Sequence, residues 1–307
     1  MTAENTGILT LLAQDYLKEK RSRRRWGIFF KILIALYLLA LLVAYFSSGS
    51  KAVDLPHTAL VEVSGPIGPQ STSADDINYS LKKAFEAPNS KAVVLRLNSP
   101  GGTPVQAAKI FEEVVRLRNQ NDDKPIYAVI TDVCASGCYY VAAAADEIYA
   151  HPSSLVGSIG VRLDGFGFVE SMRKLGVERR LITAGKNKGM LDPFSPVDAS
   201  VQSHTRQMLT EVHNQFIDAV KTGRGDRLSS DEDLFSGLVW SGEKAKTLGL
   251  VDGFRGLDSV ARDVVDAEKI VDYTFKPEWW HKIGDQVGAS IADSLISAFS
   301  ENKPVLK

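Results

Sequence analysis

The sequence lacks several features that define large classes of protein. Only two of its 307 residues are cysteine, too few for a disulfide framework or a cysteine-rich zinc site. It contains no H-E-x-x-H or C-x-x-C pair, and no glycine-rich segment follows the dinucleotide-binding fingerprint. We therefore expect neither a metal ion nor a cofactor. The formal net charge of −1 provides no overall field that attracts nucleic acid, so we expect no nucleic-acid partner.

The two cysteines, Cys134 and Cys138, lie four residues apart, where a strand-like segment is followed by a helix-like one. A disulfide between them is an alternative for a domain that faces an oxidising compartment. However, this spacing at a turn-to-helix junction seldom suits disulfide geometry. We therefore expect the two side chains to pack as small, unlinked residues.

Long hydrophobic runs are absent except for one near the N-terminus. Residues 26–46 read WGIFFKILIALYLLALLVAYF, close to the roughly 20 apolar residues that cross a hydrocarbon core of about 30 Å. The only charge, Lys31, lies one turn inside the run, and its ammonium group can reach the interface. A cleaved signal peptide is the alternative, but the run is longer than the usual 7–15 residues and no clear A-x-A site follows it. We predict one uncleaved transmembrane helix.

Charge is distributed unevenly along the chain. Residues 1–50 carry seven basic and three acidic side chains, a local charge of +4, which leaves −5 for residues 51–307. The cluster Arg23-Arg24-Arg25 directly precedes the apolar run, and basic residues next to a span stay on the cytoplasmic side. We therefore expect the N-terminus to lie inside and the bulk of the chain to be exported.

The exported part alternates strand-like and helix-like segments. Apolar, β-rich segments occupy residues 58–67, 91–99 and 125–135, and helical periodicity occupies residues 75–87, 104–120, 199–225, 241–251 and 256–268. Residues 138–150 have the pattern of a helix that leads into a short strand. Strands at this spacing, each followed by a helix, predict an α/β domain with a parallel sheet and helical crossovers.

Three segments place glycine next to reactive side chains. The first, residues 98–103 (NSPGGT), lies between a strand and a helix. Paired glycines let the backbone approach a ligand closely, and a helix N-terminus behind them adds positive potential. Gly101 and Gly102 are therefore candidate donors to an oxyanion, although a plain strand-to-helix turn has the same pattern.

The second segment, residues 134–140 (CASGCYY), also follows a strand and begins a helix. Its small neighbours expose the hydroxyl of Ser136 and place a backbone N–H, its own or that of Gly137, near the same point. The segment is not the G-x-S-x-G elbow, because both outer positions are cysteine. Since Ala-Ser-Gly is more often a helix N-cap than a nucleophile, the segment alone favours a cap and leaves a nucleophile as the alternative.

The third segment, residues 184–194 (AGKNKGMLDPF), contains Lys186 and Lys188. A lysine in an apolar, desolvated position has a lowered pKa and can act as a general base toward serine. On composition alone, two solvated loop lysines are expected. A histidine base is less favoured, because only His151, fifteen residues after Ser136, is placed to complete a triad.

These three segments, with residues 157–161 (GSIGV) between the second and third, resemble the signal peptide peptidase A family. Its members are membrane-anchored serine–lysine peptidases with a ClpP/crotonase-like fold. Residues 235–242 and 245–252 look like the closing segment of that family. One domain behind one anchor resembles the short bacterial form.

The resemblance implies a repeated β-β-α superhelical domain over residues 57–265. We expect four further parts around it: a cytoplasmic basic tail (1–25), a transmembrane helix (26–46), a linker (47–56) and a C-terminal extension (266–307).

Transferred position by position, the family pattern assigns the nucleophile to Ser136. The general base is Lys188, in a G-x-x-K motif that begins at Gly185, and Lys186 is out of register. The implied oxyanion donors are Gly101 and Gly102, assisted by Gly137. The implied wall of the substrate groove is Gly157, Ser158, Ile159 and Gly160. Two positions depart from the pattern, since Cys138 replaces a usual glycine and Cys134 a small residue.

The resemblance implies a serine endopeptidase in the bacterial cytoplasmic membrane, with its catalytic domain on the periplasmic side. Its substrates are released signal peptides or other apolar peptides, cleaved through an acyl-enzyme. Because 52 residues separate Ser136 from Lys188, the fold or a neighbouring subunit must bring them together. Family members form rings, so we expect a homo-oligomeric ring, and a dyad shared between protomers is open.

Two other classes of function are open to the same fold. One is a catalytically silent membrane scaffold, which need not retain both Ser136 and Lys188. The other is a crotonase-type acyl-CoA enzyme, which export disfavours because acyl-CoA is cytosolic.

Overall fold

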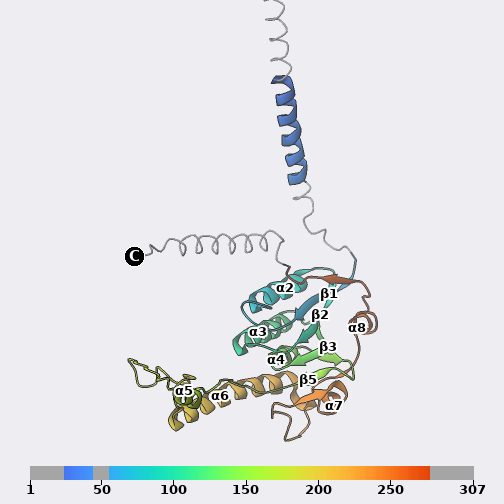
Figure 1. Cartoon of the computed structure of the whole chain (residues 1–307). Helices are drawn as coiled ribbons and strands as arrows, with labels where there is room; N and C mark the ends of the chain where they lie inside the picture. The colour runs from blue at the N-terminus through green and yellow to red at the C-terminus, as the bar shows by residue number, and fades with distance from the viewer. Residues whose placement is uncertain (1–23, 44–54, 277–307) are drawn as a thin grey trace, which may run out of the picture. The chain divides into compact units, whose positions relative to one another are not determined.

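The computed structural model describes residues 24–43 and 55–276 (Figure 1). The chain divides into two units, with the boundary between Val53 and Asp54. The first contains one helix, Arg24–Val43, of 20 residues with a mean hydropathy of 2.4. Its side chains are exposed along its length, and it is long and apolar enough to cross a membrane. Most of the predicted basic tail and linker, and residues 277–307 of the extension, lie outside the described residues.

The second unit is built on an eight-stranded sheet. The strands are β1 His57–Ser64, β2 Ser90–Ser99, β3 Ile126–Ala135, β4 Glu147–Ala150, β5 Leu155–Gly157, β6 Val239–Ser241, β7 Gly253–Phe254 and β8 Ile270–Asp272. Their order is β6-β5-β3-β2-β1-β8, with β4 beside β3 and β7 beside β4. Every neighbouring pair is parallel except β5 with β6. The α/β class predicted from the sequence is confirmed.

Strand β3 pairs with two different strands along one of its edges. Its first half, Tyr127–Val129, pairs with β4, and its last residues, Val133–Ala135, pair with β5. The end of β3 therefore lies between β2 and β5, and the chain leaves the sheet there at Ser136.

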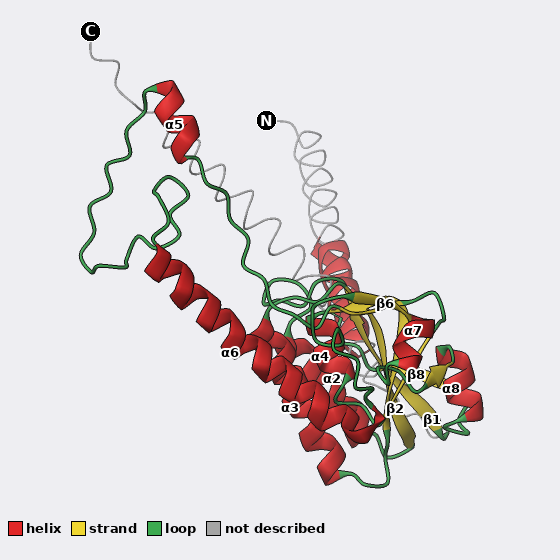
Figure 2. Ribbon diagram, turned by 90° about the horizontal axis from the view of Figure 1, so that it is seen from below, coloured by secondary structure: helices red, strands yellow, loops and turns green. Residues whose placement is uncertain are grey.

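Helices cover both faces of the sheet. The larger core lies beneath α2 Ala74–Glu86, α3 Pro104–Gln120, α4 Gly137–Ala142 and α6 Ala199–Arg224 (Figure 2). On the other face, α8 Leu257–Asp263 packs through Val260 against Val94 and Val129. Helix α7 Gly242–Thr247 follows β6. Because both faces are covered, β1 and β2 are buried almost continuously, as is typical of parallel strands.

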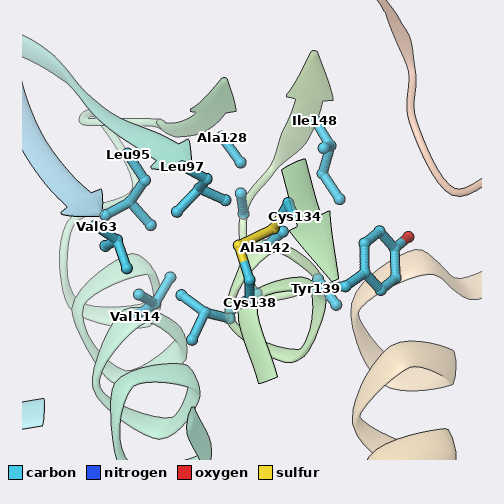
Figure 3. Packing of buried hydrophobic residues seen from close by; sticks show 14 of the residues in the cluster. Val63, Leu95, Leu97, Val114, Ala128, Cys134, Cys138, Tyr139, Ala142 and Ile148 are labelled. Carbon is cyan, nitrogen blue, oxygen red and sulfur yellow. A yellow bond between two sulfur atoms is a disulfide. The ribbon is translucent and has the colours of Figure 1, made fainter. Parts of the chain in front are cut away.

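Cys134 and Cys138 form a disulfide, so the expectation of two unlinked residues was wrong. Cys134 lies near the end of β3, and Cys138 is the second residue of α4. The sharp turn at Ser136 brings their Cα atoms to 5.1 Å, within the range that a disulfide requires. Figure 3 shows the bond inside the larger core, where both residues are fully buried.

Behind α4, a buried ion pair joins the C-terminal end of α6 to the chain before β7. Arg224, 1% exposed, donates from Nη1 and Nη2 to the two carboxylate oxygens of Asp252 at 2.8 and 2.9 Å. The same carboxylate accepts the N–H of Ile148 at 2.7 Å. Burial raises the pKa of Asp252, but these donors lower it by more, and the pKa lies below its ordinary value.

Residues 161–198, which we call the arm, differ from the rest of the domain because none of them is buried. The arm includes α5 Val169–Leu175 and lies at the N-terminal end of α6, away from the sheet (Figures 1 and 2). Its own contacts shape it: Phe168 N–H donates to the carbonyl of Pro193 at 2.7 Å, and the rings of Phe168 and Phe194 stack.

Candidate active site

Ser136 lies at the turn between β3 and α4, with φ 54° and ψ −125°. Few residues with a side chain adopt this conformation, and it persists only where the surrounding structure holds it. The N–H of Ser136 donates to the carbonyl of Gly157 at 2.8 Å, and its carbonyl accepts from Tyr140 N–H at 3.1 Å. Although Ser136 is the N-cap residue of α4, its side chain makes no capping hydrogen bond. The hydroxyl is therefore free for another role.

The Gly101-Gly102 backbone lies directly against this turn. A β-carbon on Gly101, whose φ is 98°, would lie 2.6 Å from Ala135 O and 2.8 Å from both Gly137 N and Ser136 Cβ. A β-carbon on Gly102 would lie 1.8 Å from the carbonyl oxygen of Ile67. Neither position has space for a side chain, so glycine is required at both.

The three predicted oxyanion donors have different environments. Gly101 N–H donates to Ser99 Oγ at 3.1 Å, so in this conformation it is not free for the predicted role. The N–H groups of Gly102 and Gly137 donate to no acceptor in the described part of the chain. The Gly102 nitrogen lies 3.2 Å from the point where a β-carbon of Gly137 would be. These two groups form the candidate oxyanion hole beside Ser136.

The fully buried Ser99 belongs to the candidate site and was missed by the sequence analysis. By accepting the Gly101 N–H, it orients the loop so that the following N–H is left unpaired. Its only signal in the sequence is its place at the end of an apolar strand, directly before the Pro-Gly-Gly turn.

A cleft of about 1140 Å³ opens over the hydroxyl of Ser136. Gly102 and Gly137 line it beside the serine, and apolar contributions come from Val105, Ala108, Tyr140, Val161, Val212 and Phe216. Four charged residues also line it: Lys109, Glu112, Arg162 and Asp164. The volume and the apolar lining fit a peptide segment better than a single small molecule.

The predicted groove wall is only partly at the surface of this cleft. Ser158 and Gly160 line it, whereas Gly157 lies behind Ser136 and accepts its N–H. Ile159 is fully buried and packs in the core instead. The carbonyl of Ile159 also lies 3.0 Å from Nε2 of the half-buried His213.

Within one chain, the structure does not bring Lys188 to Ser136. Lys188 is exposed on the arm, in a turn closed by its N–H to the carbonyl of Gly185 at 3.1 Å. Neither Lys188 nor Lys186 lines the cleft. A single protomer therefore presents the nucleophile and the oxyanion donors without the predicted base.

No other predicted group replaces this base. His151 lies outside the cleft, and its Nδ1 accepts the N–H of Ser153 at 3.1 Å. Within residues 24–43 and 55–276, no three His, Cys, Asp or Glu side chains are grouped to hold a metal ion.

Comparisons with known proteins agree with this geometry. The profile of Peptidase family S49 matches residues 118–271, half of the chain. A putative signal peptide peptidase SppA of Enterococcus faecium is 30% identical over 235 residues, which cover 72% of this chain and 67% of that protein. The chain belongs to peptidase family S49. This confirms the resemblance to the signal peptide peptidase A family.

Other relatives share smaller parts of their length. A Na⁺/H⁺ antiporter NhaA of Brucella abortus is 46% identical over 182 residues, 59% of this chain and 25% of the antiporter. A putative protease of Methanocaldococcus jannaschii is 36% identical over 162 residues, 53% of this chain and 51% of that protein. The chain thus spans a quarter of the first relative and about half of the second.

Proposed function

We propose that this protein is a membrane-anchored serine endopeptidase that uses Ser136 as its nucleophile and Lys188 as its general base. One observation carries the proposal. Ser136, with φ 54°, lies between a strand and a helix, its hydroxyl does not cap the helix, and two unpaired backbone N–H groups lie beside it. In α/β-hydrolases, whose sequence motif differs, the nucleophilic serine also stands on a strained strand-to-helix turn. Membership of a peptidase family supports the same reaction.

In the proposed reaction, the oxygen of Ser136 attacks a peptide carbonyl while its proton passes to neutral Lys188. The carbonyl oxygen becomes an oxyanion, which accepts hydrogen bonds from the N–H groups of Gly102 and Gly137. The lysine returns the proton to the departing amine, and an acyl ester remains on Ser136. Water, deprotonated by the same lysine, then hydrolyses the ester. Since the base must be neutral, activity rises with pH.

Since Lys188 does not line the cleft of its own protomer, the proposed base has to come from a neighbouring one. Lys188 lies on an arm that has no buried residue and carries exposed apolar side chains, including Phe166 at 81% and Ile182 at 96%. Exposed apolar surface of this kind marks contact with another protein. We infer that the arm packs on a second copy, and that each Lys188 serves the Ser136 of a neighbour in a homo-oligomeric ring.

The proposed substrates are released signal peptides or other apolar peptides in an extended conformation. The apolar part of the cleft suits such side chains, and an extended segment can pair its backbone with the groove wall at Ser158 and Gly160. The helix Arg24–Val43 would hold the enzyme at the membrane, where such peptides are released. Its basic flank supports a domain on the periplasmic side of a bacterial inner membrane.

A mixing experiment tests nucleophile, base and sharing together. We expect Ser136→Ala to lower kcat/KM on an unfolded apolar peptide by at least about 10⁴-fold. Chains with Ser136→Ala and chains with Lys188→Ala, each inactive alone, should regain part of the activity when dissociated and reassembled together. Wild-type chains carried through the same steps are the control.

Three results would contradict parts of the proposal. Cleavage that survives Ser136→Ala identifies another nucleophile. An assembled wild type that cleaves nothing favours the silent scaffold. Mixed chains that stay inactive place both residues of the dyad in one protomer.

A further inference from the structure

The feature that the mechanism has not used is the disulfide that encloses the candidate nucleophile. Cys134 and Cys138 lie two residues before and two residues after Ser136. The bond therefore closes a loop of five residues with the serine at its centre. These are the only cysteines in the chain, so the chain contains no other thiol that can exchange with them.

Both ends of this loop are held in the core. Cys134 pairs with Ser99 of β2 and with Val156 of β5. Cys138 is fully buried beneath the sheet, next to α3 (Figure 3). With both sulfurs fixed, the three residues between them have little freedom to turn in any other way.

The conformation of Ser136 needs such a restraint. A positive φ at a residue with a β-carbon is unfavourable, and it relaxes unless its surroundings oppose the relaxation. The hydrogen bond from Ser136 N–H to Gly157 is one restraint, and the disulfide is a second that does not depend on it. Backbone atoms of this turn also pack on Gly101, so a relaxed turn would move the hydroxyl relative to the oxyanion donors.

We propose that the Cys134–Cys138 disulfide positions the Ser136 hydroxyl for attack, so that peptidase activity depends on its oxidation. This inference rests on the proposed function. Reduction by a dithiol breaks the S–S bond and gives each sulfur one electron and one proton, while the dithiol closes to its own disulfide. Two separate thiols need more space than a bonded pair. In a packed core, the turn between them must absorb the difference.

The predicted effect is on the chemical step and not on substrate binding. Misplacement of a reacting group by about 1 Å can lower a rate by about 100-fold. The cleft walls at Val105, Val161 and Phe216 lie outside the five-residue loop. Reduction should therefore lower kcat at least tenfold and leave KM within twofold.

The experiment uses the full chain in detergent, oxidised or reduced by long exposure to excess dithiothreitol, because both sulfurs are buried. Peptide cleavage gives kcat and KM, and amide hydrogen exchange follows residues 134–140 with β1 as an internal reference. We expect reduction to lower kcat, to speed exchange at Ser136 and Tyr140 but not in β1, and to be reversed by reoxidation. A Cys134→Ala/Cys138→Ala double variant should have the low kcat with or without reductant.

The possible results separate this inference from the proposed function. A lower melting temperature with unchanged kcat would make the disulfide a structural cross-link only and overturn the inference. If the oxidised wild type does not cleave, the proposed function fails, and exchange at Ser136 still tests the restraint. Unchanged hydrogen exchange at Ser136 after reduction would then overturn the inference. If the double variant does not fold, reduction of the wild type carries the test alone.

Discussion

The turn at Ser136 and the arm that carries Lys188 differ in what holds them. From Cys134 to Tyr139 every residue except Ser136 is buried, and two hydrogen bonds and a disulfide fix the turn. Along the arm no residue is buried, and the side chain of Ile182 is 96% exposed. One half of the proposed dyad is thus built by the fold of a single chain. The other half lacks the packing that would position it.

The largest effect that tests this contrast is loss of the base. Lys188→Ala should lower kcat/KM by about 10³-fold or more, because the serine then has no proton acceptor. Lys186→Ala is the matched control: it removes the same charge two residues away on the arm and should change activity less than about threefold. Peptide cleavage at pH 8 measures both. Equal losses would mean that the arm contributes charge rather than one positioned amine.

The next largest effect is expected when the buried ion pair between Arg224 and Asp252 is broken. Asp252→Ala leaves the buried guanidinium of Arg224 without its charged partner and with only the Nε–H bond to the carbonyl of Gly249, and should lower the free energy of unfolding by about 3–5 kcal/mol. Because the pKa of Asp252 is lower in the folded protein than in the unfolded chain, the wild type has this stabilisation above the unfolded pKa. The wild type loses this stabilisation as pH falls through the pKa that Asp252 has in the folded protein.

Urea unfolding at pH 7 and at pH 3 measures both parts of that prediction. The difference between Asp252→Ala and wild type should be large at pH 7 and smaller at pH 3. A difference that does not change between these pH values would contradict the assigned role of the carboxylate.

A smaller effect is expected at the contact between the glycine loop and the turn. Gly101→Ala puts a β-carbon 2.6 Å from the carbonyl oxygen of Ala135 at a residue with φ 98°. The turn must shift, so kcat should fall about 100-fold, while the melting temperature falls by a few degrees. Gly165→Ala, on the arm where nothing lies within 4 Å, is the control and should leave kcat within about twofold. An active Gly101→Ala enzyme would show that the loop and the turn are not coupled.

The smallest effect on stability is expected on the arm itself. Ile182→Ser should change the free energy of unfolding of the dissociated chain by less than about 0.5 kcal/mol, because its side chain packs against little in the monomer. If the arm packs on a second copy, the same substitution should shift the sedimentation profile toward smaller species and lower activity in parallel. Unchanged assembly would place the interface elsewhere.

The elements set by local pattern were predictable from the sequence. The predicted helix over residues 199–225 matches α6, Ala199–Arg224, because a long amphipathic period that ends at glycine is a strong local signal. The apolar segments likewise became β1, β2 and β3. The family resemblance implied that the serine turn and its glycine loop are neighbours, and the parallel strands that precede them bring both to the same edge of the sheet.

Features that depend on exact turn geometry or on a second chain were not predictable. The disulfide was judged improbable from its spacing, which does not reveal a turn with φ 54°. The hydrogen bond from Gly101 N–H to Ser99 Oγ depends on the rotamer of this buried serine, which the sequence does not reveal. The short strands β6, β7 and β8 have two or three residues each, too few for a periodic pattern. The position of Lys188 relative to Ser136 is not fixed by any contact within one chain.

The close fit of α6 against α4 has a mechanical consequence. A β-carbon on Gly223 would lie 1.8 Å from the carbonyl oxygen of Ala143, so the last turn of α6 rests directly on the end of the helix that Ser136 begins. The 26 residues of α6 make a rod about 39 Å long, and its C-terminal part is also held by the buried Phe216 and Val220, so a rotation of about 5° at Phe216 swings its first residue by about 2 Å. A small shift where α6 packs on α4 is therefore amplified at the arm that carries Lys188, beyond the other end of the helix.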